Sequence, residues 1–320
     1  MGHSKNFVDE SWAIWIDGDD TTTIYFNEWV NPKKRSYVDV AIRVRNIMQS
    51  NKMNLYIPFP IDYDEIEDVS LKLDNEKILR AIFSASCIID FKKNEHTSEI
   101  AYNGKTIDLV HLDKKLMELK NIANGTILSY SLSELHKFLD NDECYFVFRI
   151  PHKSLDKLFK PRKKVTHFFE RIRDSFSTPV INEKYGLSIR INEGRLIPQE
   201  INKIGAFHRQ KLKKAVVTIS IDEDYELNDA NCYTIRRLEK DLHESYVPEK
   251  FKCDDVITYQ WLDSRKDNFR GAFNFYLNIG REHISKTSMF IYMILILFVG
   301  LVGEGLLLLI YKFYDILTKL

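Results

Sequence analysis

The stretch YVDVAIRVR at residues 37–45 alternates apolar and polar side chains with a period of two. Successive side chains of a β-strand point to opposite faces, so this period is typical of a strand with one buried face. The alternation recurs in TIYF (23–26), VSLKL (69–73), TIDLVHL (106–112), YGLSIRI (185–191), AVVTISI (215–221), VITYQWL (256–262) and AFNFYLNI (272–279). We therefore predict a mainly β (α+β) fold, an antiparallel β-sandwich-like region with short helices.

More continuous apolar runs accompany these segments. Two of them are interpreted as strands buried on both faces: ILRAIFSASCIID (78–90) and CYFVFRI (144–150). Turn residues such as Asn103-Gly104 lie between neighbouring strands, which favours antiparallel pairing over repeated βαβ units. Short helices are expected at residues 113–121, 131–139 and 233–244.

The charge composition changes near Pro151. Residues 1–150 hold 24 acidic and 18 basic side chains, whereas residues 151–320 hold 22 acidic and 28 basic ones. A hydrophobic fraction of 44% is enough to build a sizeable core. We expect a β-rich domain at residues 1–150 and a basic α+β domain at residues 151–287, with one continuous domain as the alternative.

The segment Asp17-Gly18-Asp19-Asp20-Thr21 fits the pattern DxDxT. It resembles the motif of haloacid-dehalogenase-like phosphotransferases, in which the first Asp is the nucleophile and the second is the acid. The resemblance stops at these five residues, because the βα alternation, the later lysine and the further acidic pair of that family are missing. We interpret the flanking stretches WAIWI and TTTIYF as two strands of a hairpin joined by a polar turn.

Other motifs that would mark an enzyme, a metal site or a cofactor site do not occur in the sequence. There is no GxGxxG, no GxxxxGK[ST] and no GxSxG elbow. The four cysteines are widely spaced, and the nine histidines form no HExxH pair. We expect reduced cysteines, no enzymatic activity, no metal and no cofactor.

Two basic segments contain interleaved aromatic residues: KPRKKVTHFFERIR (160–173) and AFHRQKLKK (206–214). Basic side chains neutralise phosphates and aromatic rings stack on bases, which favours a nucleotide or a short single-stranded DNA or RNA as ligand. A solvated basic face and a contact with anionic lipid headgroups are the alternatives. The candidate ligand-binding residues are Arg162, Lys163, Lys164, His208, Arg209, Lys211, Lys213 and Lys214.

Residues 288–311, SMFIYMILILFVGLVGEGLLLLIY, are almost entirely apolar. A helix of this length covers roughly 36 Å and is long enough to cross a hydrocarbon core of about 30 Å. More basic residues precede the segment than follow it, and the N-terminus has no signal-peptide pattern. We expect a single-pass protein of the cell inner membrane, with residues 1–287 cytoplasmic and residues 312–320 as a short tail on the other side.

Gly300, Gly303 and Glu304 fall on one side of this helix at 100° per residue. Glycines allow close approach of helices, and an ionisable group at membrane depth is costly unless it faces protein or water. We therefore predict a homo-oligomer in which copies of Glu304 form the acidic ring of a cation pore. The alternative is a plain anchor whose Glu304 is protonated or reaches the membrane interface.

This layout of a β-rich cytoplasmic region, basic segments and one terminal span resembles membrane effectors of bacterial anti-phage defence systems controlled by nucleotides or oligonucleotides. It is similar in architecture to the membrane effector of Hailong-type defence. The resemblance implies an oligomeric channel controlled by short DNA oligomers. The alternative function is a tail-anchored scaffold whose β domain binds a protein partner at the inner membrane.

Overall fold

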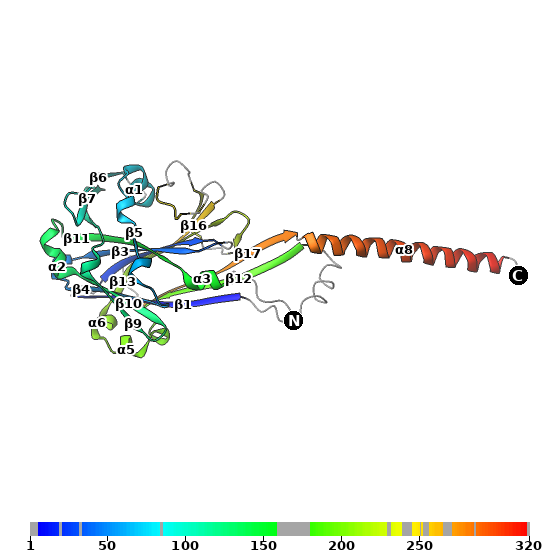
Figure 1. Cartoon of the computed structure of the whole chain (residues 1–320), viewed down its shortest axis with the longest axis horizontal. Helices are drawn as coiled ribbons and strands as arrows, with labels where there is room; N and C mark the ends of the chain where they lie inside the picture. Colours follow the sequence, from blue (N-terminus) through cyan, green and yellow to red (C-terminus); the bar gives the residue numbers. More distant parts are fainter. Residues whose placement is uncertain are drawn as a thin grey trace. The chain divides into compact units, whose positions relative to one another are not determined.

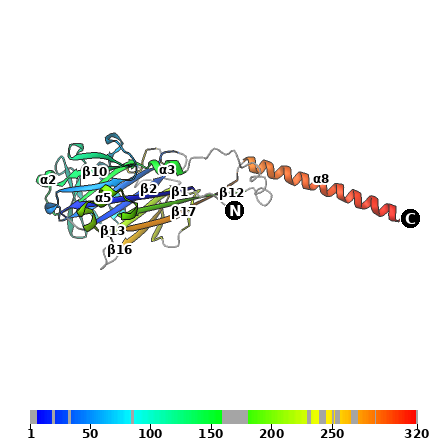
Figure 2. The same ribbon diagram turned by 90° about the horizontal axis from the view of Figure 1, so that it is seen from below.

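The computed structural model describes residues 6–18, 21–31, 34–83, 86–158, 180–228, 232–238, 245–249, 251, 256–264, 271–284 and 286–318. It contains two mixed β-sheets, short helices and one long C-terminal helix, so the predicted mainly β class is confirmed. Most of the long strands run roughly along one direction (Figure 1, Figure 2).

The seven-stranded sheet has the order β14-β17-β12-β1-β4-β10-β9. Its strands are β1 Asn6–Asp17, β4 Lys52–Ile57, β9 Met117–Ile122, β10 Gly125–Ser131, β12 Val180–Ile191, β14 Glu226–Asn228 and β17 Phe273–Ile284. The ten-stranded sheet has the order β15-β16-β13-β2-β3-β11-β8-β7-β6, with β5 paired to β11. Its strands are β2 Thr21–Val30, β3 Tyr37–Arg45, β5 Glu67–Asp68, β6 Cys87–Asp90, β7 Thr97–Tyr102, β8 Lys105–Val110, β11 Glu143–Pro151, β13 Lys211–Asp222, β15 Thr234–Arg237 and β16 Val256–Ser264.

The described α-helices are mostly short. They are α1 Glu76–Phe83, α2 Leu132–Leu135, α3 Lys153–Leu158, α5 Gln199–Asn202, α6 Gly205–Arg209 and α8 Lys286–Leu317. The chain divides into two compact units. The first consists of Met1–Lys160, Tyr185–Glu223 and Leu227–Ile279, and the second of Pro161–Lys184, Asp224–Glu226 and Gly280–Leu320.

Strands from both sides of residue 150 share each sheet. Strand β12 pairs in parallel with β1, and β13 pairs in parallel with β2. A third parallel pair joins β8 to β11, and the other described pairs are antiparallel. Residues 1–150 and the described strands after residue 180 therefore build the same two sheets.

The turn after Asp17 carries the chain from one sheet to the other. The predicted strands on either side of it are confirmed as β1 and β2, but the predicted hairpin is wrong because they lie in different sheets. Gly18 has a φ of 115°, and a Cβ there would lie 2.1 Å from the backbone oxygen of Gln49, so this turn requires glycine. Between the sheets, the rings of Trp12 and Phe26 pack edge to face with their centroids 5.0 Å apart.

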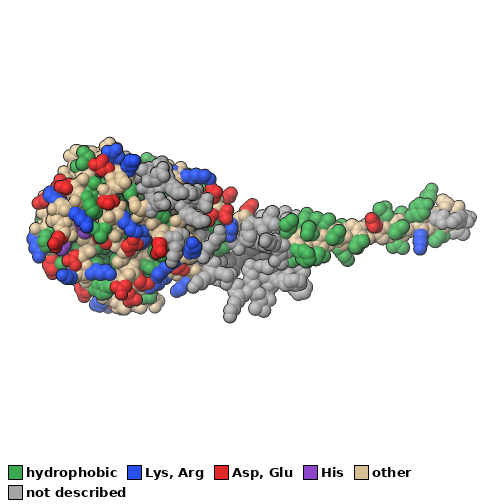
Figure 3. Space-filling model, turned by 45° about the horizontal axis from the view of Figure 1, so that its top comes forward, with side chains coloured by type: hydrophobic (Ala, Val, Ile, Leu, Met, Phe, Trp, Pro, Cys, Tyr) green, Lys and Arg blue, Asp and Glu red, His purple; other side chains and the backbone are tan. Residues whose placement is uncertain are grey.

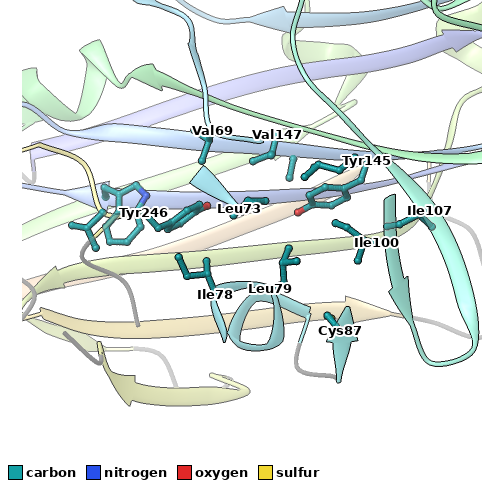
Figure 4. Close-up of a cluster of buried hydrophobic side chains, with 14 of the residues drawn as sticks. Val69, Leu73, Ile78, Leu79, Cys87, Ile100, Ile107, Tyr145, Val147 and Tyr246 are labelled. Carbon is teal, nitrogen blue, oxygen red and sulfur yellow. The ribbon is translucent and has the colours of Figure 1, made fainter. Parts of the chain in front are cut away.

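Smaller hydrophobic clusters cover the outer faces of both sheets. Figure 4 shows Ile78 and Leu79 of α1 pointing toward Tyr145 and Val147, which belong to β11 of the ten-stranded sheet. On the seven-stranded sheet, helices α5 and α6 provide the cover, and Phe207 contributes to a cluster around β1. Each outer face of the sandwich is therefore partly covered by helices.

The two continuous apolar runs have different outcomes. Residues 144–150 are confirmed as a buried strand within β11. The prediction of a single strand at residues 78–90 is wrong, because its first half forms α1 and only β6 is extended. Ile78, Leu79 and Phe83 recur at the spacing of one helical stripe, which a continuous apolar run does not distinguish from a strand.

Two further short predictions are wrong, a third is wrong for residues 233–238 while residues 239–244 lie outside the described part of the chain, and one is confirmed. Residues 113–121 form a 3-10 turn followed by β9, because pairing with β10 overrides the helix propensity of their Lys, Leu, Met and Glu residues. The described part of residues 233–244 contains strand β15 rather than a helix, and residues 69–73 contain a 3-10 turn. The helix expected at residues 131–139 is confirmed as α2 and the 3-10 turn after it.

A buried ion triplet joins the two sheets next to the end of β11. The side chain of His152 is fully buried, with Nδ1 2.7 Å from Oε2 of Glu28 on β2 and Nε2 2.6 Å from Oε2 of Glu10 on β1. Burial opposes a charge on the ring, but the two carboxylates outweigh it and raise the pKa of His152 to about 10. The ring is therefore an imidazolium at neutral pH and donates one hydrogen bond to each sheet.

The two carboxyl groups of the triplet differ in acidity. Burial raises the pKa of Glu28 above its ordinary value, and the charge of His152 offsets this only in part. Burial acts on Glu10 in the same direction and is the largest single effect, but the charge of His152 and the hydrogen bonds to the carboxylate together outweigh it, so the pKa is lowered. Glu10 is therefore the firmer counter-ion of the imidazolium.

We predict that His152→Gln destabilises the fold by about 3–5 kcal/mol near pH 6, because two buried carboxyl groups lose their charged partner. A raised pKa means that the contribution of His152 is fully present below pH 6.5 and is lost as the pH rises toward about 10. Urea unfolding of the full chain in detergent micelles, followed by tryptophan fluorescence near pH 6 and near pH 10, measures both effects.

The triple variant E10Q/E28Q/H152Q is the control for this experiment, because it carries the same change at His152 and also replaces the two carboxyl groups by amides of the same shape, so no charge remains. Its stability should fall less than that of the wild type between the two pH values. Equal losses in the two proteins would show that His152 is not charged in the folded state.

Candidate functional site

Helix α8 is long and apolar enough to cross a membrane. Residues Met289–Tyr314 form a candidate span of 26 residues, which corresponds to roughly 39 Å of helix. None of the described side chains in this span is buried against the rest of the protein. Figure 3 shows green hydrophobic side chains along the helix. An apolar surface of this length requires lipid or other protein around it.

The three candidate packing residues all lie on α8. Gly300, Gly303 and Glu304 are exposed, and a Cβ added at either glycine would meet no described atom within 4 Å. The helix continues beyond Tyr311 to Leu317, so most of the predicted tail is helical.

The structure describes five of the eight basic candidates, and these five lie on two different elements. Arg162, Lys163 and Lys164 lie outside the described residues. His208 and Arg209 belong to α6, which packs on the seven-stranded sheet, and Nε2 of His208 lies 2.5 Å from the backbone oxygen of Asn202.

The remaining candidates lie on β13 of the ten-stranded sheet. Lys211 is exposed at the first position of this strand, whereas Lys213 and Lys214 lie at a β-bulge. The bulge inserts Lys213 between two residues that pair with consecutive positions of β2.

At this bulge, Lys213 and Lys214 join three basic residues that the sequence prediction missed. The cationic patch, as we name it, consists of Arg43, Arg45, Lys105, Lys213 and Lys214. These side chains come from β3, from the start of β8 and from β13. The fold thus gathers five cations from positions up to 171 residues apart in the sequence (214 minus 43).

One carboxylate lies inside the cationic patch. Glu143, at the start of β11, places Oε2 2.6 Å from Nη2 of Arg43 and Oε1 2.7 Å from Nε of Arg45. The Arg43 pair is mostly buried, since the two side chains are 13% and 18% exposed. Five cations around one carboxylate leave an excess of positive charge.

Aromatic rings hold two of the cations in place. The guanidinium of Arg43 lies 5.3 Å from the ring centre of Tyr102, and Nζ of Lys214 lies 5.5 Å from the ring centre of Tyr25. Tyr25 in turn packs edge to face on the buried Tyr145 with centroids 6.1 Å apart. One face of Tyr102 and one face of Tyr25 are each occupied by a cation, so these rings fix the positions of the Arg43 and Lys214 charges.

Two lysines of the cationic patch, Lys213 and Lys214, have lowered pKa values. Burial lowers the pKa of Lys213, and the charge of Arg45 lowers it further. Burial and then the charge of Arg43 lower the pKa of Lys214. A bound anion would relieve this repulsion, and phosphate oxygens suit both the guanidinium and the ammonium groups.

Arg43 and Arg45 carry a weak signal in the sequence. They are the polar positions at the end of the alternating stretch 37–45, two residues apart and hence on one face of a strand. That pattern predicts their shared face but says nothing about which strands lie next to it. The proximity of β8, β11 and β13 comes from the sheet topology alone.

A second candidate is a cavity of about 550 Å³ on the seven-stranded sheet. It is lined by Ser188, Arg190, Arg195, Leu196, Asn274, Phe275 and Tyr276. Its two arginines are paired, since Nη1 of Arg190 lies 3.1 Å from Oδ1 of Asp9 and Nε of Arg195 lies 2.9 Å from Oε1 of Glu193. Unlike the cationic patch, the cavity has no excess of charge from its arginines.

A third group of polar side chains, His111 with Ser70 and Ser98, is buried. His111 lies between the hydroxyls of Ser70 and Ser98, at 2.8 Å and 2.7 Å, and burial lowers the pKa of this histidine to about 4. All three side chains are buried, so no substrate reaches them in this structure. Within the described part of the chain, no three His, Cys, Asp or Glu residues are grouped as metal ligands.

Comparisons with known proteins add no family. No family model and no curated protein matches the chain. Among solved structures, the chain is similar to the Fcho1 Mu homology domain of Danio rerio with bound Eps15 peptide, at 7% identity over 85% of this chain and 80% of that chain. The TM-score is 0.11, so this likeness carries no argument about fold or function.

We predict that the double variant K213E/K214E weakens binding of a short single-stranded DNA by about tenfold or more at 0.1 M salt, because it removes two phosphate contacts and adds two repulsive charges. Fluorescence anisotropy with the full chain in detergent micelles measures the affinity.

The matched control for this experiment is K115E/K120E, which makes the same charge change at two exposed positions outside the cationic patch. Equal weakening in both variants would mean that only the total charge of the protein matters.

Proposed function

We propose that the protein is an oligomeric membrane effector, an ion channel whose N-terminal region binds a nucleotide or short oligonucleotide that controls opening. The observation that carries this proposal is the position of Glu304 beside Gly300 and Gly303 on one side of an exposed apolar helix. A single helix in lipid leaves an ionised glutamate at membrane depth without a partner, whereas a ring of identical helices can place it beside water.

The glycines support the assembly step of the proposal. With no side chain at Gly300 and Gly303, the backbones of neighbouring helices can approach closely at this side. Other copies of the chain would then cover part of the apolar surface, and lipid would cover the rest. Several copies of Glu304 around one axis form a constriction that attracts cations.

The cationic patch supports the ligand step. A nucleotide or oligonucleotide that binds one arrangement of the N-terminal regions more tightly than another shifts the equilibrium between closed and open assemblies. A difference of about 5.5 kcal/mol in binding is enough to change the population from 1:99 to 99:1. The sign of control depends on which arrangement the ligand prefers.

The proposed setting is the bacterial inner membrane, with the N-terminal region in the cytoplasm and a role in anti-phage defence. The excess of basic residues before the span favours this orientation. The layout also resembles membrane effectors of nucleotide-controlled defence systems, in which the soluble region senses the signal and the helix acts on the membrane.

We predict that Glu304→Leu lowers cation conductance at least tenfold while the protein still inserts into the membrane, because the acidic ring is lost and the helix becomes more apolar. Planar-bilayer recordings of the purified protein measure conductance, and carbonate extraction of membranes measures insertion. Unchanged conductance in this variant would rule out the acidic constriction.

Two glycines provide a matched test of the oligomer. At 100° per residue, Gly303 lies about 60° from Gly300 on the predicted packing side, whereas Gly305 lies about 140° away. Gly303→Leu should therefore reduce the oligomer measured by light scattering in detergent, and Gly305→Leu should leave it unchanged. A wild-type monomer with a stable protein partner and no conductance would favour the tail-anchored scaffold instead.

A further inference from the structure

We infer that Glu143 is a built-in competitor for the anionic ligand, and that the cationic patch takes a ligand carrying at least two phosphates. One negative group would replace Glu143 at the two arginines, and the other would bind the lysines. The inference rests on the proposed function only for the identity of the ligand, because it concerns how this surface binds phosphate.

The first position for a phosphate is the one that the carboxylate now fills. Each oxygen of Glu143 faces a different arginine, at 2.6 Å for Arg43 and 2.7 Å for Arg45. Two oxygens of a phosphate can make the same pair of charge-assisted contacts, with one more oxygen and more negative charge. The Arg43 contact is a hydrogen bond, whereas Nε of Arg45 lies close to Oε1 without hydrogen-bond geometry among the described residues. A phosphate in place of the carboxylate can therefore accept a hydrogen bond that Glu143 does not accept from Arg45.

The second position lies among the lysines. Lys214 and Arg43 pair with the same residue of β2, Thr23, so the lysines lie two strands from the arginines at the same end of the sheet. Burial lowers the pKa of Lys213, the charges of Arg45, Arg43 and Lys105 lower it further, and the charge of Glu143 opposes them. For Lys214, burial and then the charge of Arg43 lower the pKa. Negative charge supplied from outside would be stabilised here without displacing any side chain.

The two positions differ in what a ligand must overcome. At the lysines, a phosphate gains contact with cations that repel one another. At the arginines, a phosphate must first separate them from Glu143, which swings toward solvent as it is released. A monophosphate can therefore bind at the lysines alone and leave Glu143 in place. A ligand with linked phosphates is already held near the arginines by its contact with the lysines, so its second phosphate displaces the carboxylate more easily.

The two tyrosine rings of this surface further restrict which class of ligand can bind. Tyr102 and Tyr25 already hold Arg43 and Lys214 over their faces. Binding through these cations depends on the spacing and charge of the phosphates, and the identity of the bases contributes little to the affinity. The chemical class is accordingly a polyphosphate or a short phosphodiester strand of any sequence.

The test replaces Glu143 with glutamine, which keeps the shape of the side chain and removes its charge. Isothermal titration of the full chain in detergent micelles uses inorganic phosphate, tripolyphosphate and a short oligo-dT as probes. We expect Glu143→Gln to tighten binding of tripolyphosphate and oligo-dT by about tenfold and to steepen the salt dependence, because two more cations contact the ligand. Binding of monophosphate should change little.

The matched control is Glu118→Gln, which removes the carboxylate of an exposed pair with Lys52 on the seven-stranded sheet. It should leave all three affinities unchanged. Glu143→Asp is the second variant and keeps the charge, so it should bind tripolyphosphate no more tightly than the wild type and separates loss of charge from misfolding. Unchanged or weaker binding in a folded Glu143→Gln protein overturns the inference.

Two further results would also overturn it. One is equal tightening of monophosphate and tripolyphosphate, which would mean a single phosphate position. The other is tightening that appears only with vesicles of anionic lipid, which would identify the cationic patch as a membrane contact. Conductance is recorded separately, so a Glu143→Gln protein that binds more tightly but conducts neither with nor without ligand would refute the proposed channel and leave the inference standing.

Discussion

The ion triplet of Glu10, His152 and Glu28 is the constraint on which the rest of the sandwich depends. Each sheet contributes one carboxyl group from a strand in its middle, and the imidazolium must lie between them at hydrogen-bond distance from both. Buried ion pairs add little net stability compared with apolar packing, but any shift of the sheets would leave a charge unpaired. The triplet therefore specifies how β1 faces β2. The edge-to-face packing of Trp12 on Phe26 follows from the same alignment.

The cationic patch lies within the ten-stranded sheet and follows from the strand order of that sheet combined with a local irregularity. Strand β2 holds β3 on one side and β13 on the other, so the arginines and the lysines approach the same end of the sheet. A regular β13 would have placed its two adjacent lysines on opposite faces, and the bulge removes this alternation. Both lysines can thus contribute to the cationic patch because β13 contains a β-bulge at Lys213. Such bulges occur often next to functional sites.

Local patterns in the sequence predicted part of this structure. The alternating stretches gave most of the long strands, and the apolar stretch gave the C-terminal helix, because burial on one face or on all faces leaves a direct mark in a single segment. His152 left no such mark, since its partners are 124 and 142 residues away. Lys213 and Lys214 were recognised as basic, but grouping them with His208 failed because α6 and β13 belong to different faces of the sandwich. Sequence neighbours and spatial neighbours coincide only within one element.

The crossing turn at Gly18 has a consequence for the time course of folding. Because β1 and β2 separate at once into different sheets, each must wait for a parallel partner that is made much later. The backbone of Ile14 is hydrogen-bonded to Asn192, 178 positions further along. At about 5–20 residues per second, synthesis of that interval lasts roughly 10–35 s, during which one edge of each strand has no native partner. A chain of this topology is therefore exposed to mispairing during synthesis for far longer than a protein built from hairpins.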